Sequence, residues 1–220
     1  MSTTSRGVFL TFEGPDGSGK STQARILVER LRGEGYPVIE TAEPGGTPIG
    51  RQIRHILLDP ANAELRPTTE LLLMFAARAQ NVEQCIMPAL AAGRMVVSDR
   101  FTDSSIAYQG AARGLGSEVV LELDRIACHG LVPDLRLCID VDSETGLARA
   151  RARNRDEPAH ETRLEEQGIE FHHKVREAYH EIARREPQRF RLIDGHDTPA
   201  AIAAKVWSEV LPLLERFKPA

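Results

Sequence analysis

The sequence predicts an α/β protein in which helices flank a five-stranded parallel sheet. Five short apolar runs alternate with longer stretches of helical patterning, which is typical of a parallel sheet with crossover helices. A glycine-rich segment at 14–21 follows the first run directly. Because ligands bind beyond the carboxyl ends of parallel strands, the residues just after each run are the candidates for function.

The expected strands are short and apolar, with β-branched or aromatic residues. They cover 8–12, 37–41, 95–98, 135–141 and 190–193. The expected helices have apolar residues at helical spacing, and the first of them ends before glycine. They cover 21–32, 69–92, 147–153, 169–185 and 199–217. With 220 residues and no long linker, the chain is expected to form one domain over 1–220.

Residues 14–21 read Gly-Pro-Asp-Gly-Ser-Gly-Lys-Ser, which matches the P-loop pattern of Gly, four residues, Gly, Lys and a hydroxyl residue. The glycines let backbone amides point inward without a Cβ in the path of a phosphate. Lys20 supplies a point charge for β- and γ-phosphates, and Ser21 supplies a hydroxyl ligand for Mg²⁺. Strand, loop and helix occur in the order that the motif requires, so a nucleoside triphosphate is the expected ligand.

Asp99 and Arg100 follow the apolar run at 95–98 and are expected beside the P-loop. A carboxylate at that edge can hold Mg²⁺ through water, and a guanidinium suits phosphate oxygens. Elsewhere in a chain such a pair would indicate a surface ion pair. Because Asp99 and Arg100 follow a strand, a role in the ligand site is favoured over a surface ion pair.

A charged segment at about 149–168 is expected to form a mobile lid between two helices. Arg149, Arg151, Arg153 and Arg155 alternate with smaller residues, and Arg163 closes the segment. One interpretation is a lid that stabilises charge on a transferring phosphoryl group. The alternatives are a solvated basic face or a strip that contacts RNA.

The helix at 69–92 carries Met74, Phe75 and Arg78 within one turn. These residues can hold a nucleobase between an apolar surface and a guanidinium that donates to a base carbonyl. A core aromatic beside a surface arginine explains the same pattern.

Composition excludes several classes. The formal net charge of −4 argues against a protein built to bind nucleic acid. No apolar run is long enough to span a membrane, and the polar N-terminus has no secretory signal, so a cytoplasmic protein is expected. The three cysteines are widely spaced and indicate neither a zinc site nor disulfides.

The motifs closely resemble those of bacterial thymidylate kinases over nearly the whole chain. They are 13–22 with the P-loop, Glu-Pro-Gly-Gly-Thr at 43–47, Phe-Ala-Ala-Arg at 75–78, and Asp-Arg-Phe at 99–101 continuing to Ala-Tyr-Gln-Gly at 107–110. The resemblance implies the P-loop nucleoside monophosphate kinase fold, a homodimer, and transfer of phosphate from MgATP to dTMP.

The resemblance also implies roles for matching residues. Catalysis would rest on Lys20, Arg100, Arg153 and Asp16, with Mg²⁺ held by Ser21 and, through water, by Asp99. ATP would contact Gly14, Pro15, Asp16, Gly17, Ser18, Gly19, Lys20, Ser21, Thr22, Arg149, Arg151 and Arg153. The dTMP would contact Asp16, Glu43, Pro44, Arg54, Phe75, Arg78, Arg100, Ser105, Tyr108 and Gln109.

At two positions the chain differs from a pattern found in this family. The family usually has its stacking aromatic four residues before the base-reading arginine, where this chain has Met74, so either Met74 or Phe75 faces the base. Some members of the family carry an arginine in the P-loop, at the position where this chain has Gly17. The resemblance therefore implies that the catalytic arginine of this chain lies in the lid. The remaining alternatives are a kinase for another nucleoside monophosphate or a deoxynucleoside, and an RNA-associated nucleotide switch.

Overall fold

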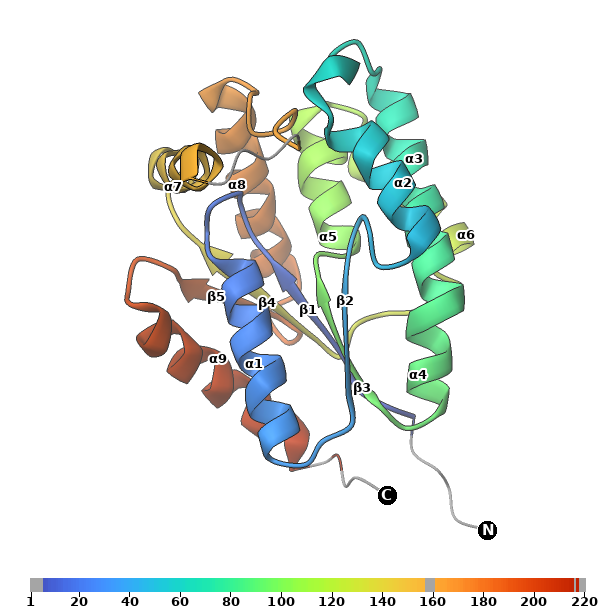
Figure 1. The fold of residues 1–220 in the computed structure, drawn as a ribbon, viewed down its shortest axis with the longest axis vertical. Coiled ribbons are helices and arrows are strands. Elements are labelled where there is room, and N and C mark those ends of the chain that lie inside the picture. Colours follow the sequence, from blue (N-terminus) through green and yellow to red (C-terminus); the bar gives the residue numbers. More distant parts are fainter. Residues whose placement is uncertain (1–5, 157–160, 216, 218–220) are drawn as a thin grey trace.

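The computed structural model describes residues 6–156, 161–215 and 217, without the side chains of Arg155 and Asp156. Part of the expected lid, 157–160 with the Arg155 side chain, therefore lies outside the described residues. Five parallel strands form one sheet in the order β2-β3-β1-β4-β5, which confirms the predicted fold class (Figure 1). The strands are β1 Phe9–Glu13, β2 Val38–Ala42, β3 Met95–Asp99, β4 Leu135–Asp140 and β5 Phe190–Asp194.

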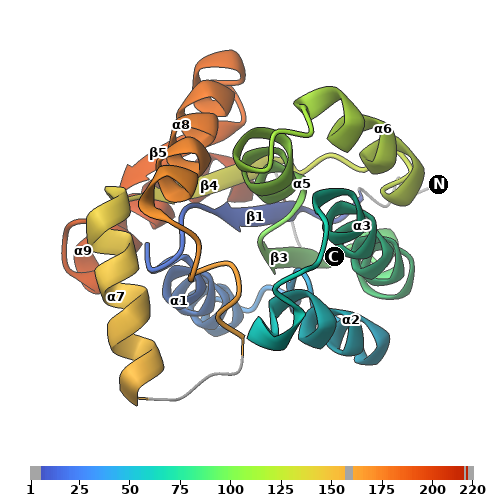
Figure 2. The same cartoon turned by 90° about the horizontal axis from the view of Figure 1, so that it is seen from above.

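Helices cover both faces of the sheet, as Figures 1 and 2 show. Their bounds are α1 Lys20–Gly33, α2 Pro48–Leu58, α3 Pro67–Asn81, α4 Met87–Ala91, α5 Thr102–Ser105, α6 Ser117–Ala127, α7 Ser143–Asp156, α8 Ile169–Arg185 and α9 Pro199–Leu214, with a 3₁₀ turn at Pro60–Asn62. The α8 bounds agree with the predicted helix 169–185, whereas α2 and α6 were not among the predicted helices.

Strand β1 lies in the centre of the sheet and is buried on both sides. Its side chains alternate between two apolar clusters, as the period of two in a strand requires. Leu10 and Phe12 pack in the cluster that includes α1 and α9 residues, whereas Phe9 packs with α3 and α6 residues. This burial fixes the strand and therefore the position of the loop that follows it.

The predicted helix 69–92 is interrupted. A π-helical turn at Val82–Ile86 separates α3 from α4, and Pro88 lies in the first turn of α4. Proline cannot donate the helical hydrogen bond, and its ring crowds the carbonyl four residues earlier, so a widened turn accommodates it. A second π-helical segment, Ile106–Ala112, continues from α5.

Candidate active site

The P-loop joins β1 to α1 and curls against the start of α7. Gly17 has φ of 71°, and a Cβ there would lie 2.0 Å from the carbonyl oxygen of Gly146. Gly19 caps α1 with φ of 93°. Both values lie in the left-handed region that favours glycine, so the sequence of the loop is explained by its backbone as well as by an approaching phosphate.

Lys20 begins α1 and is 7% exposed. Its Nζ donates to the carbonyl of Pro15 at 3.3 Å and lies 3.8 Å from Asp16 Oδ1. Burial and the nearby charge of Arg100 lower the pKa of Lys20 to about 8. An anion bound beside Lys20 would favour its charged form.

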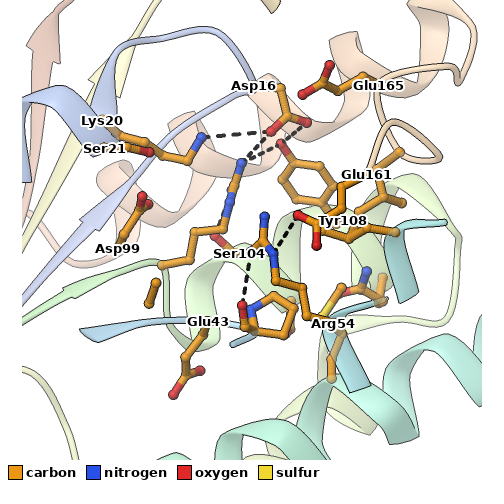
Figure 3. Close-up of a pocket in the computed structure, with 18 of the residues that line it drawn as sticks. Asp16, Lys20, Ser21, Glu43, Arg54, Asp99, Ser104, Tyr108, Glu161 and Glu165 are labelled. Atoms are coloured by element: carbon orange, nitrogen blue, oxygen red, sulfur yellow. Dashed lines mark hydrogen bonds and ion pairs between the residues drawn. The ribbon is translucent and has the colours of Figure 1, made fainter. Parts of the chain in front are cut away.

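A cavity of about 320 Å³ opens beyond the carboxyl ends of the strands (Figure 3). Its lining includes predicted residues from the P-loop, from the segments after β2 and β3, from α2 and α3, and from the lid. They are Asp16, Lys20, Ser21, Glu43, Pro44, Arg54, Arg78, Asp99, Arg100, Ser105, Tyr108, Gln109 and Arg153. One cavity thus brings together residues that lie up to 137 positions apart, from Asp16 to Arg153.

Arg100 lines this cavity and has φ of 73°. Its Nη2 donates to Asp16 Oδ1 at 2.6 Å and to the Tyr108 hydroxyl at 3.2 Å. Tyr108 in turn donates to Asp16 Oδ2 at 2.8 Å. Burial opposes ionisation of Asp16, but Arg100, Lys20 and Tyr108 outweigh it and lower its pKa to about 2. Asp16 is therefore a carboxylate with a fixed orientation at neutral pH.

Behind Arg100 lies a buried polar cluster that the sequence did not reveal. Arg100 Nη1 donates to Ser104 Oγ at 3.0 Å and to the Tyr179 hydroxyl at 3.3 Å. Ser104 donates to Glu13 Oε2 at 2.6 Å. Burial and the nearby carboxyl of Asp103 raise the pKa of Glu13 to about 8. The one feature of the sequence that could have indicated this cluster was Glu13, a glutamate at the end of a mostly apolar strand.

At the far end of the cavity, Arg78 is held by a buried carboxylate. Its Nε donates to Glu43 Oε2 at 2.5 Å, and its Nη2 donates to Ser105 Oγ and to the carbonyl of Phe101, both at 3.0 Å. Its Nη1 is buried and has no partner among the described residues. That nitrogen is the donor left for a ligand.

The structure settles which α3 side chain faces the cavity. Met74 lines it, whereas Phe75 does not and instead packs in the apolar cluster with Phe9 and Val96. The Phe75 ring lies against the guanidinium of Arg78, 4.6 Å from its central carbon. The predicted stack of Phe75 on a base therefore disagrees with the structure, because the burial of Arg78 fixes the rotation of α3.

Two ion pairs involve acidic residues of the expected lid. Arg54 Nε lies 2.8 Å from Glu161 and its Nη1 donates to Pro44 at 2.9 Å. Arg153 Nη2 lies 2.6 Å from Glu165. Figure 2 shows α7 across from α2, with the segment that leads into α8 between them. The two acidic side chains line the cavity and were not among the predicted site residues.

The other predicted lid arginines lie elsewhere. Arg149 Nη1 donates to the carbonyl of Gly195 at 3.0 Å, in the loop after β5. Arg151 lines a separate hollow beside Asn154. Arg163 is buried, with an ion pair to Glu70 at 2.8 Å, so it does not belong to an exposed charged flap as the sequence suggested.

Four further residues of the predicted P-loop site do not line the cavity. Gly14, Pro15 and Ser18 are buried, whereas Thr22 is exposed on the first turn of α1.

The residues predicted for Mg²⁺ lie on one cavity wall. Asp99 Oδ1 is buried and has no partner in the described part of the chain, and Ser21 lines the same cavity. An orphaned carboxylate oxygen beside a hydroxyl fits a hydrated Mg²⁺ better than a site of protein ligands alone. Among the side chains that the structure describes, no three His, Cys, Asp or Glu residues cluster as a metal site. None of the described helices has the length and apolar character needed to cross a membrane.

Comparison with known proteins identifies the family of the chain. The thymidylate kinase family model matches residues 12–206. Thymidylate kinase of Thermomicrobium roseum is 49% identical over 208 residues, with 94% of this chain and 96% of that protein covered. Thymidylate kinase of Pelobacter propionicus is 48% identical, with 93% and 94% covered.

A solved structure also superposes on this chain. The crystal structure of thymidylate kinase from Ehrlichia chaffeensis has a TM-score of 0.76 and 30% identity, and the match covers 94% of this chain and 99% of that one. Sequence and structure comparisons therefore agree over almost the whole length. The chain belongs to the thymidylate kinase family.

Proposed function

We propose that the chain transfers the γ-phosphoryl group of MgATP in line onto the phosphate of dTMP, giving dTDP and ADP, within the cavity described above. The observation that carries this proposal is that Lys20 of the P-loop, Arg100 and the base-side Arg78 line one cavity. A donor phosphate at one end can then face an acceptor nucleotide at the other.

ATP is proposed to lie along the P-loop amides with Lys20 at its β- and γ-phosphates. Ser21 and Asp99, the latter through water, would hold Mg²⁺, which when bound neutralises phosphate charge. Arg149 and Arg151 are proposed to contact ATP from the lid side. The Arg149 bond to the Gly195 carbonyl places it near the loop after β5, beside the carboxyl ends of the strands.

The dTMP is proposed to lie between Tyr108 and Arg78. Arg78 Nη1 would donate to O4 of thymine, since it is the guanidinium nitrogen that has no partner among the residues the structure describes. Met74, which lines the cavity, would lie against the base instead of Phe75. Asp16 would accept the 3′-hydroxyl, and Tyr108 would crowd a 2′-hydroxyl. Glu43, Pro44, Ser105 and Gln109 complete the lining.

Catalysis in this proposal is positioning and charge neutralisation. The acceptor phosphate already carries a nucleophilic oxygen, so neither a strong base nor a covalent intermediate is needed. Lys20, Arg100 and Arg153 would stabilise the charge on the transferring group, and Arg54 with Arg100 would hold the acceptor phosphate. A lid over about 149–168 would exclude water as a competing acceptor.

An ADP-release assay comparing dTMP, dUMP, dCMP and AMP tests the proposal. We expect dTMP to be preferred, since Arg78 can donate to a carbonyl but cannot accept from the cytosine amine. A preference for dCMP or AMP would overturn the substrate assignment. RNA retention with a steep salt dependence and no phosphotransfer would favour a nucleotide switch instead.

A homodimer in the cytoplasm, built from one domain per chain, completes the proposal and rests on the family. Light scattering coupled to size exclusion tests the dimer: a mass of twice 24.3 kDa supports it, and a mass of one chain opposes it.

A further inference from the structure

Glu70 connects three parts of the molecule through one carboxylate. It lies in the first turn of α3 and is fully buried. Its Oε1 accepts from Gln109 Nε2 at 2.9 Å. Its Oε2 accepts from Arg113 at 3.2 Å and lies 2.8 Å from Arg163 Nη2. Helix α3, the π-helical segment and the chain that leads into α8 therefore meet at this side chain.

This contact determines which way the Gln109 amide points. A carboxylate flanked by two guanidinium groups only accepts hydrogen bonds, so the amide nitrogen of Gln109 must face it. The amide oxygen then lies on the other side of the group. Gln109 lines the cavity, and its Oε1 makes no hydrogen bond within the part of the chain that the structure describes. An acceptor is thus left for a ligand.

The cavity consequently offers an acceptor and a donor in fixed roles. Gln109 Oε1 is the acceptor, and the unpartnered Arg78 Nη1 is the donor. Ser105, which accepts from Arg78, lies four positions before Gln109 and lines the same cavity. A pyrimidine with N3–H and a 4-carbonyl complements this pair, whereas cytosine presents the reverse pattern at both positions.

We propose that Glu70 is a positioning residue for base selection: it holds the Gln109 amide with its oxygen toward the nucleobase and ties that orientation to the anchored end of the lid. This inference rests on the proposed function.

The link to the lid runs through Arg163. Its backbone amide donates to the carbonyl of Leu58 at 3.1 Å and its Nε donates to the carbonyl of Leu57, so this end of the segment is attached to α2. The ion pair with Glu70 adds α3 to the attachment. Loss of the Glu70 carboxylate would therefore allow the Gln109 amide to rotate and would weaken the attachment of Arg163 to α3.

Glu70→Gln tests the inference, because its amide can donate as well as accept and no longer dictates the Gln109 orientation. We expect kcat/KM for dTMP to fall about tenfold and its preference over dCMP to fall by a similar factor, with KM for ATP unchanged. The preference and KM do not depend on the folded fraction, so partial unfolding does not obscure them.

The double variant E70Q/Q109E exchanges the two groups. The amide at 70 then donates to the carboxylate at 109, whose second oxygen accepts from N3–H, so the preference for dTMP should recover relative to E70Q. Glu186→Gln is the matched control: it also removes a carboxylate from a buried arginine, Arg136, but lies outside the cavity lining. It should lower thermal stability and leave the preference unchanged.

A folded E70Q variant with the dTMP preference of the original chain would overturn the inference, and so would an exchange variant that recovers none of it. Absence of dTMP phosphorylation by the unmodified chain would instead overturn the proposed function. The two failures are therefore distinguishable.

Discussion

Arg100 and Asp16 form an ion pair of 2.6 Å across the cavity, and Tyr108 completes a triangle by contacting both. The pair joins the segment after β3 to the P-loop after β1, which are neighbouring strands. Both terminal nitrogens of Arg100 donate to groups of the chain, and only its Nε has no partner among the described residues. A phosphate oxygen would therefore meet Arg100 at Nε or by displacing one of these contacts.

Replacing Lys20 with alanine should reduce turnover about a thousandfold or more, because the buried ammonium is the point charge closest to the proposed phosphates. The coupled ADP-release assay measures this. Lys205→Ala, an exposed lysine on α9, is the control and should retain the original rate. A K20A variant within tenfold of that rate would argue against the role of Lys20.

Replacing Arg153 with alanine should lower kcat by a factor of about a hundred to a thousand while changing KM for dTMP little, since its charge would act on the transferring group. Steady-state kinetics with dTMP varied separates the two constants. The exposed Arg184 provides a matched alanine control. Equal losses in kcat and in dTMP affinity would contradict a role in the transition state.

Glu13 should make stability depend on pH. Its pKa is about 8 in the folded chain against 4.5 for the free side chain, so the folded state keeps a proton that the unfolded state loses. This contribution to the unfolding free energy is fully present below pH 4.5 and is lost as pH rises to about 8. Urea titrations across that range should show the decline, and E13Q should flatten it.

The control for Glu13 is Glu118→Gln, an exposed glutamate on α6, which should leave the pH profile as it is. If E13Q and the original chain lose stability in parallel between pH 4.5 and 8, Glu13 is not the group responsible.

Arg100 should carry backbone strain. Its φ of 73° lies in the left-handed region, where residues with a Cβ are less stable by about 1–2 kcal/mol. Arg100→Gly should therefore be more stable than Arg100→Ala by about 1 kcal/mol, and both should be inactive. Chemical denaturation measures the difference. Equal midpoints for the two variants would mean that the left-handed backbone is not strained.

The five-stranded parallel sheet was predictable because each strand is a short run rich in apolar residues between stretches of helical patterning. The P-loop and Arg100 were predictable because each follows such a run, at the edge of a parallel sheet where ligands bind. The π-helical turn before Pro88 was missed, because apolar spacing continues through it. Glu13 and Ser104 are 91 positions apart, and no local pattern reports such a contact.

The sequence alone could not decide whether Met74 or Phe75 faces the cavity. Neighbouring positions on a helix point about 100° apart, and helical spacing allowed either one to face a base. The rotation of α3 is set by the buried contact between Arg78 and Glu43, which joins positions 35 apart. Glu161 and Glu165 were likewise visible as charges in the sequence, but their arginine partners were not.

The π-helical segment Ile106–Ala112 has a consequence for how the chain tolerates change in length. A π turn contains one more residue than the α turn it replaces, so deleting a single residue there would restore a regular helix with better backbone geometry. A deletion before Tyr108 would turn both Tyr108 and Gln109 by roughly 100° relative to the sheet. The irregular turn therefore sets the direction in which these two side chains meet the cavity that they line.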